Sequence, residues 1–304
     1  MNFREVEEFF KTKNVHAFLV HQHGEKKVTY YKAEECTSTP YKINSITKSI
    51  MALLIGIAID KGYIENVHTP IKTWIPHIPK EKEKLTLYHL LTMTTGEKWY
   101  EFKKEAIFPK EFANANNWVE HIVDTPMNED PGIAMNYNSG SSHLLSYILQ
   151  EATSMTTEVF AMKYLFEPMR IEDVTWQQDA QGVYNGGFGM AMLVEDLLKI
   201  GILCLQKGEW DGQQLISKQW IEESTESLFR TYEHVGSYGY QWWILNSHKD
   251  DFPYHTYFAM GFGGQFIIVI PQLELVSVIH SYMPKRGLIP LQQFLAYIKN
   301  EYSF

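Results

Sequence analysis

The sequence contains little that would place it outside the ordinary globular proteins. Only two of its 304 residues are cysteines, Cys36 and Cys204. Cys204 lies in an apolar helical pattern, so we expect a buried free thiol there and no disulfide. The longest apolar stretch runs from Ile50 to Ile59, far short of the ~20 residues that span a bilayer. We therefore expect no transmembrane helix.

Positive charge is also scarce. The chain has 27 basic against 36 acidic residues and a formal charge of −9, and no basic run is interleaved with aromatic residues. This composition argues against nucleic acid as a partner. His21 and His23 share one face of a predicted strand, but no acidic or cysteine residue follows them at ligand spacing. We expect no metal and no organic cofactor.

The start of the chain lacks the apolar core of a signal peptide. Residues 1–13 are charged and amphipathic, which predicts a folded first helix. We expect a cytoplasmic protein, or an exported one whose leader has been removed. The sequence does not indicate an oligomeric state.

Predicted strands gather at the two ends of the chain, and predicted helices in the middle. Alternation predicts a hairpin of residues 15–22 and 27–32, and three- and four-residue spacing predicts helices between 69 and 207. Later strands are expected at 238–245, 265–270 and 275–280, before a last helix at 288–302.

This order predicts an α/β fold of the α+β type, with an antiparallel sheet flanked by the first and last helices. We expect residues 1–62 and 208–304 to form a sheet-containing lobe and residues 63–207 a mostly helical lobe. Together they would make one discontinuous catalytic unit. Clefts between such lobes usually hold the site.

Ser45 and Lys48 form the first candidate for catalytic chemistry. Residues at i and i+3 share a helix face, so the Lys48 amine can reach the Ser45 hydroxyl. The helix that follows is apolar on every side, and burial with a helix N-terminus would favour the neutral amine, a possible base. Asn44 is the expected N-cap and Gly62 the expected C′ residue. Ser-x-x-Lys alone is a common chance pattern.

Two further motifs hold candidate residues. Tyr137 precedes a predicted helix, where a phenol could relay a proton, especially if a nearby amine lowers its pKa. A glycine-rich run, Met260–Gln265, enters a late strand and has no Lys-Ser/Thr ending, so a nucleotide site is not expected. It is either a bulge or turn, or a strand edge whose N–H groups complete an oxyanion hole with the Ser45 N–H.

Taken together, these segments resemble the serine β-lactamase and penicillin-binding protein superfamily, in particular its class C-like branch with esterases and amidases. The resemblance covers most of the chain. It rests on SITKSIMALLIGIAIDKGYI, LTLYHLLTMTTG, PGIAMNYNSGSSHLLSYIL, GGFGMAMLVEDLLKIGILCLQKGEWDGQQLIS, YGYQWWI and GFGGQFIIVIP. It implies a β-lactamase-like fold and an acyl-enzyme mechanism in which Ser45 attacks a carbonyl while Lys48 and Tyr137 move the proton.

The resemblance also suggests which residues bind substrate. Ser139 stands where the family's Tyr-x-Asn motif has asparagine, and Phe262 begins the stretch that replaces its Lys-Thr-Gly or His-x-Gly. Gln265 is the expected second oxyanion donor, with Gly264 as the alternative. Trp99, with the aromatic residues after it, would form a wall over the nucleophile and favour an apolar acyl or alcohol group.

Three functions remain open at this level. The first is a serine hydrolase acting on a small ester or amide, favoured by Phe262 and Ser139 and by the missing export signal. The second is a β-lactamase or D-alanyl-D-alanine carboxypeptidase. The substrate carboxylate of such an enzyme would be bound by the cation of the Lys-Thr-Gly or His-x-Gly motif, which the stretch beginning at Phe262 lacks. The third is a ligand-binding relative without catalysis, against which Ser45, Lys48 and Tyr137 argue.

Overall fold

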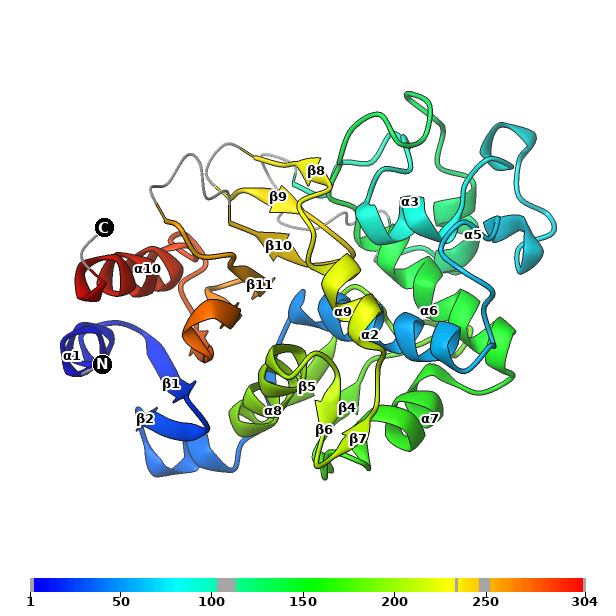
Figure 1. The fold of residues 1–304 in the computed structure, drawn as a ribbon. Helices are drawn as coiled ribbons and strands as arrows, with labels where there is room; N and C mark the ends of the chain where they lie inside the picture. Colours follow the sequence, from blue (N-terminus) through cyan, green and yellow to red (C-terminus); the bar gives the residue numbers. More distant parts are fainter. Residues whose placement is uncertain (1–2, 103–111, 113, 233–234, 246–251, 303–304) are drawn as a thin grey trace.

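The computed structural model describes residues 3–102, 112, 114–232, 235–245 and 252–302. Its main feature is an antiparallel sheet in the order β2-β1-β13-β12-β11-β10-β9-β8 (Figure 1). The strands are β1 (Val15–Gln22), β2 (Glu25–Tyr31), β8 (Phe229–Arg230), β9 (Ser237–Tyr238), β10 (Trp243–Ile244), β11 (Tyr257–Gly261), β12 (Gln265–Ile270) and β13 (Leu275–Ser281). The first and last parts of the chain meet where β1 pairs with β13, as predicted.

The two faces of this sheet bury different side chains, because successive strand residues point in opposite directions. On β1, Phe18 and Val20 pack in one apolar cluster with helices α1 (Arg4–Lys11) and α10 (Ile289–Glu301). Ala17 and Leu19 belong to the other cluster. Figure 1 shows α1 and α10 side by side, away from the remaining helices. The expected packing of the first and last helices on the sheet is confirmed.

The second cluster joins the sheet to the remaining helices. Helix α2 (Ile46–Asp60) is buried from Ile46 to Ala58, as its apolar sequence predicted, and contacts both β11 and α6. Gly62 follows the C-cap residue Lys61, and its φ of +74° fits the expected C′ position. The other helices are α3 (Leu87–Thr92), α5 (Trp118–Val123), α6 (Ser139–Thr153), α7 (Thr157–Ala161), α8 (Val194–Leu205) and α9 (Lys218–Ser224). Short helical turns lie at 34–37, 71–73, 80–82, 162–166 and 271–273.

Several short strands differ from the sequence prediction. The single strand expected at 238–245 is divided into β9 and β10, since Gln241 has a φ of +60° and turns the chain between them. β11 was not predicted as a strand. Nor was a small sheet in the order β3-β5-β4, made of β3 (Tyr41–Lys42), β4 (Thr175–Trp176) and β5 (Met190–Met192), or the pair β6 (Glu209–Trp210) and β7 (Gln213–Gln214).

The division into a sheet lobe and a helical lobe stays a prediction. Helix α8 lies within residues 63–207 and yet packs on β13, β12 and β1. Cys36 and Cys204 are both buried free thiols. Within the part of the chain that the structure describes, no helix is both long enough and apolar enough to cross a membrane.

Candidate active site

A cavity of about 430 Å³ opens between the end of β11 and the starts of α2 and α6. Ser45, Tyr137, Ser139 and Phe262, four of the residues singled out in the sequence, line it. Most of the other residues that line the cavity are apolar. The complete remaining lining is Asn44, Glu101, Phe102, Phe188, Tyr232, Val235, Trp243, Met260, Gly261, Gly263, Pro284, Gly287 and Leu288.

Ser45 stands at the very start of α2. It occupies the N-cap position with φ −72° and ψ 0°, so the expectation that Asn44 is the N-cap is wrong. Asn44 instead takes a left-handed conformation with φ +46°, which asparagine tolerates better than most residues. Its side chain donates to the Phe262 carbonyl at 2.9 Å and to Gln265 Oε1 at 3.2 Å. These hydrogen bonds join the loop of Ser45 to the β11–β12 turn.

Lys48 is buried beside Ser45, with a relative exposure of 1%. Its Nζ lies 3.0 Å from Ser45 Oγ, 2.9 Å from Ser139 Oγ and 2.7 Å from the Gly187 carbonyl oxygen. Burial lowers the pKa of Lys48 to about 8, although the charge of Glu101 acts in the opposite direction. The amine is therefore closer to neutral than an exposed lysine, as the apolar helix predicted.

Tyr137 reaches the same point from the loop before α6. Burial raises the pKa of its phenol above the ordinary value, and a hydrogen bond with Ser45 opposes this only in part. The condition considered from the sequence, a phenol pKa lowered by a nearby amine, is not met, because burial raises the pKa. The ring stacks between Phe102 and Trp243, with centroids at 5.8 and 5.5 Å. The raised pKa keeps the phenol protonated near neutral pH. The centroid of its ring lies 4.9 Å from Lys48 Nζ.

Ser139 begins α6 and contacts Lys48 rather than only bordering the substrate space. Its hydroxyl also donates to Glu101 Oε1 through a short hydrogen bond, and its N–H donates to Glu101 Oε2 at 3.0 Å. Glu101 was not predicted from the sequence. It follows two aromatic residues in an irregular segment, so neither spacing nor a helix face singled it out.

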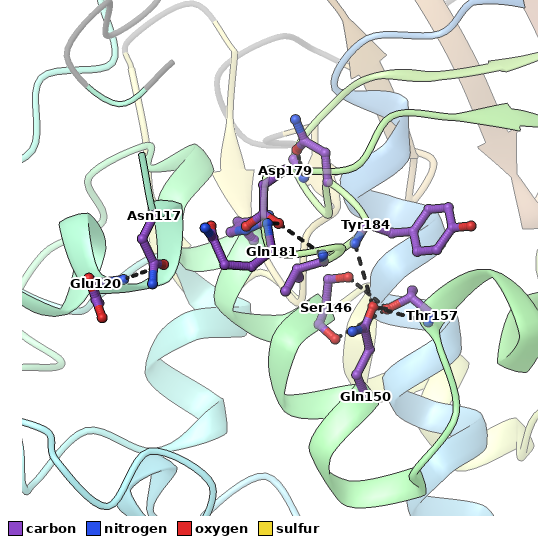
Figure 2. Close-up of polar contacts among 12 residues, drawn as sticks. Asn117, Glu120, Ser146, Gln150, Thr157, Asp179, Gln181 and Tyr184 are labelled. Carbon is purple, nitrogen blue, oxygen red and sulfur yellow. Dashed lines mark hydrogen bonds and ion pairs between the residues drawn. The ribbon is translucent and has the colours of Figure 1, made fainter. Parts of the chain in front are cut away.

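Gly187, another partner of Lys48 missed in the sequence, belongs to a segment anchored on α6. Gln150 Oε1 accepts from the Tyr184 N–H at 3.5 Å, and His143 Nε2 lies 3.1 Å from Asp179 Oδ2. Figure 2 shows the contacts of Gln150 with Tyr184 and Thr157, and Asp179 next to Gln181. These contacts fix the backbone that presents the Gly187 carbonyl. The only sequence signal was the Gly186-Gly187 pair.

The glycine-rich run forms the turn between β11 and β12. Gly261, Phe262 and Gly263 line the cavity, whereas Gly264 and Gln265 do not. The Gly264 N–H donates to the Gly261 carbonyl at 3.3 Å, and the side chain of Gln265 accepts from Asn44. A Cβ on Gly261 would lie 2.5 Å from the Ile43 carbonyl oxygen, so this position needs glycine for the close approach to the loop that precedes Ser45.

The expected aromatic wall is present in part. Phe102 lines the cavity and is 60% exposed. Trp99 lies behind the lining, 6% exposed, where its Nε1 donates to Glu101 Oε2 at 2.7 Å. Trp242 packs in the core against Tyr257, and the next residue, Trp243, borders the cavity. Searched over the described residues alone, His, Cys, Asp and Glu form no group of three that could hold a metal ion.

Known proteins resemble this chain in sequence and in fold. A 6-aminohexanoate-dimer hydrolase of Paenarthrobacter ureafaciens is 22% identical in an alignment 295 residues long that covers 88% of this chain and 72% of that protein. The octameric penicillin-binding protein homologue of Pyrococcus abyssi superimposes with a TM-score of 0.79 at 18% identity, covering 100% of this chain and 78% of that one.

A third likeness is to EstCE1, described as a hydrolase with promiscuous acyltransferase activity. It has a TM-score of 0.77 at 15% identity and coverage of 97% of both chains. The fold is thus β-lactamase-like, as the sequence resemblance implied. The family model called Beta-lactamase matches residues 15–285. A match over so much of its length means that the chain belongs to the Beta-lactamase family.

Proposed function

We propose that the protein is a serine hydrolase that forms an acyl-enzyme at Ser45 on small, neutral esters or amides. The observation that carries this proposal is the surrounding of Lys48. A buried amine lies 3.0 Å from the Ser45 hydroxyl, and its other two contacts are with Ser139 Oγ and the Gly187 carbonyl. A neutral amine that donates its two hydrogens to those oxygens presents its lone pair to Ser45.

In the acylation step, Ser45 Oγ forms a bond to the substrate carbonyl carbon and its proton passes to Lys48. The tetrahedral intermediate then collapses, and the bond to the leaving oxygen or nitrogen breaks. The leaving group takes a proton from Tyr137, which recovers one from Lys48. This assignment follows from the two pKa shifts, lowered for the amine and raised for the phenol.

In the deacylation step, water attacks the acyl carbon and the bond to Ser45 Oγ breaks. The water proton passes through Lys48 and Tyr137 to Ser45, and the carboxylic acid leaves. The oxyanion of both intermediates needs N–H donors. We assign one to Ser45 at the start of α2 and the other to the segment 261–263. That segment lines the cavity, unlike Gly264 and Gln265, and Asn44 ties its Phe262 carbonyl to the nucleophile loop.

The cavity lining favours a neutral, apolar substrate group. Among the described lining residues, Glu101 is the only one with a charged side chain, and its oxygens already accept three hydrogen bonds. No lining residue in the described part of the chain is cationic, so a substrate carboxylate would find no opposite charge among them. The relative from Paenarthrobacter ureafaciens is by name a hydrolase of a 6-aminohexanoate dimer, which supports a small amide or ester as substrate.

The direct test is a substrate panel on one purified sample, with Ser45→Ala as the matched control. We expect turnover of p-nitrophenyl esters with short to medium acyl chains, and none by Ser45→Ala. Rapid turnover of a chromogenic cephalosporin, faster than any ester, would favour a β-lactamase instead. If an activated fluorophosphonate left Ser45 of the folded protein unlabelled, the ligand-binding alternative would replace our proposal.

A further inference from the structure

Glu101 is a buried carboxylate at the edge of the cavity, only 6% exposed. Its Oε2 accepts from Trp99 Nε1 at 2.7 Å and from the Ser139 N–H at 3.0 Å, and its Oε1 faces the Ser139 hydroxyl. The indole and the backbone amide can only donate. The carboxylate is therefore surrounded by donors, and it has little capacity left to bind a substrate directly.

This surrounding decides the direction of the Ser139 hydroxyl. A hydroxyl has one hydrogen, and the short contact with Glu101 Oε1 takes it. Ser139 Oγ then faces Lys48 Nζ, 2.9 Å away, as an acceptor. The Gly187 carbonyl, 2.7 Å from the same nitrogen, is also an acceptor only. Lys48 must donate to both, and the direction left for its lone pair is toward Ser45.

We propose that Glu101 is a positioning residue for the base: through Ser139 it directs the lone pair of the Lys48 amine at Ser45, and its charge stabilises the ammonium that forms when Lys48 takes the proton. The inference rests on the proposed function, since it gives Lys48 the role of base. Glu101 itself touches neither the nucleophile nor the substrate in this scheme.

The charges around Lys48 support the second part of the proposal. Glu101 raises the pKa of Lys48 against the larger effect of burial. In the described part of the chain, Glu101 also acts electrostatically on Tyr137, Tyr232 and Tyr238, and burial raises the pKa of all three phenols. They are neutral over the range in which Lys48 titrates. Removal of the Glu101 charge should therefore lower the pKa of Lys48.

The experiment compares Glu101→Gln, Glu101→Asp and the native protein by two readouts. The first is the pH profile of kcat/KM for a neutral ester. The second is the titration of the Lys48 side chain by NMR on 15N-lysine-labelled protein, with the signal identified by its absence in Lys48→Ala. Glu151→Gln, which removes a carboxylate exposed on α6, is the matched control for the loss of one negative charge.

We expect Glu101→Gln to move the Lys48 titration and the acid limb of kcat/KM to lower pH by about one unit. The plateau of kcat/KM should fall by roughly ten-fold or more, because the ammonium loses its counter-charge. Glu101→Asp keeps the charge, so its limb should stay within a few tenths of a unit of the native position while part of the rate returns. Glu151→Gln should move neither readout.

A Glu101→Gln variant that is folded and whose Lys48 titrates as in the native protein would overturn the inference, whatever its rate. If the native protein hydrolysed no ester or amide, the proposed function would be wrong, and this result would be independent of the role of Glu101. The NMR titration would still decide whether Glu101 controls Lys48, because it does not depend on turnover.

Discussion

Lys48 is costly to bury, and its environment lowers the cost by favouring the uncharged amine. A buried ammonium loses its hydration, a penalty of several kcal/mol even when partners are present. Burial of Lys48 to 1% exposure lowers its pKa to about 8, so near neutral pH a useful fraction of the side chain is uncharged. The same desolvation that destabilises the cation makes Lys48 available for the role of base that we propose.

The pH dependence of the reaction follows from this shift. Because the attack needs the neutral amine, kcat/KM should fall about ten-fold per pH unit below the Lys48 pKa of about 8 and level off above it. Because the pKa of Tyr137 is raised, we expect the phenol to lose its proton, and the enzyme its activity, only at a pH well above the Lys48 pKa. Steady-state rates between about pH 5 and about pH 10 measure the acid limb of the kcat/KM profile. A profile that is flat across this range would contradict Lys48 as the base.

The two proton carriers should be distinguishable by mutation. Lys48→Ala should lower kcat by several orders of magnitude, since an unassisted hydroxyl is a poor nucleophile. Tyr137→Phe keeps the ring between Phe102 and Trp243 and removes only the phenolic oxygen, and we expect it to be nearly as damaging. Single-turnover kinetics would separate acylation from deacylation. Retention of most activity by Tyr137→Phe would mean that Lys48 acts alone.

At this scale, the sequence identified the side chains that carry a recognisable spacing and missed those that act through tertiary contacts. Ser45 and Lys48 are one helical turn apart, so their proximity is local. Glu101 and Gly187 are 53 and 139 residues from Lys48 along the chain. Only the folded structure brings them there, and a lone glutamate or glycine has no local pattern that would predict it.

At the scale of elements, a buried ion pair supports the start of α6. Lys82 Nζ lies 2.5 Å from Glu97 Oε1 and donates to the Ile122 carbonyl at 2.9 Å. Glu97 Oε2 accepts from Asn138 Nδ2 at 3.1 Å, and Asn138 caps α6 by accepting from the Ser141 N–H. These contacts therefore hold Asn138, the residue between Tyr137 and Ser139, in place.

Breaking this pair should destabilise the protein. Lys82→Met leaves the Glu97 carboxylate buried at 1% side-chain exposure without its cation. We expect the free energy of unfolding to fall by about 3–5 kcal/mol. Urea denaturation followed by tryptophan fluorescence measures it. The double variant Lys82→Met/Glu97→Gln should recover part of the loss, and a double variant less stable than the single one would refute the explanation.

The elements themselves were predictable where their pattern was long. The hairpin at the start of the chain and the last helix carry a clear period over many residues, and α2 is predicted by a long stretch that is apolar on every side. β9 and β10 are two residues each, and the turn between them depends on Gln241, whose Nε2 donates to the carbonyls of Leu90 and Leu91. Such strands are set by partners elsewhere in the fold and have no period of their own.

At the scale of the whole molecule, a cluster of three rings joins the main sheet to the small sheet β3-β5-β4. His280 on β13 lies 5.3 Å from the His16 ring on β1 and 4.4 Å from the Tyr41 ring on β3. β3 leads directly into the loop of Ser45. Burial, with a smaller contribution from His16, lowers the pKa of His280 from 6.5 to about 4.

This shift predicts a loss of stability in acid. Between pH 6.5 and 4 the unfolded chain binds a proton at this position and the folded protein does not, so stability falls as the pH falls. The contribution amounts to about 3 kcal/mol over the whole interval. Free energies of unfolding at several pH values, for the native protein and for His280→Phe, give the measurement. The phenylalanine variant should lose less stability on acidification, and parallel curves for the two proteins would contradict the prediction.

Capture of the acyl-enzyme tests the central claim most directly. After a millisecond acid quench during ester turnover, peptide mass spectrometry should find the mass of the acyl group on the peptide that contains Ser45. The adduct should be missing in Lys48→Ala on the same time scale. An acyl group on another residue, or steady turnover with no adduct on Ser45 at any quench time, would contradict the account.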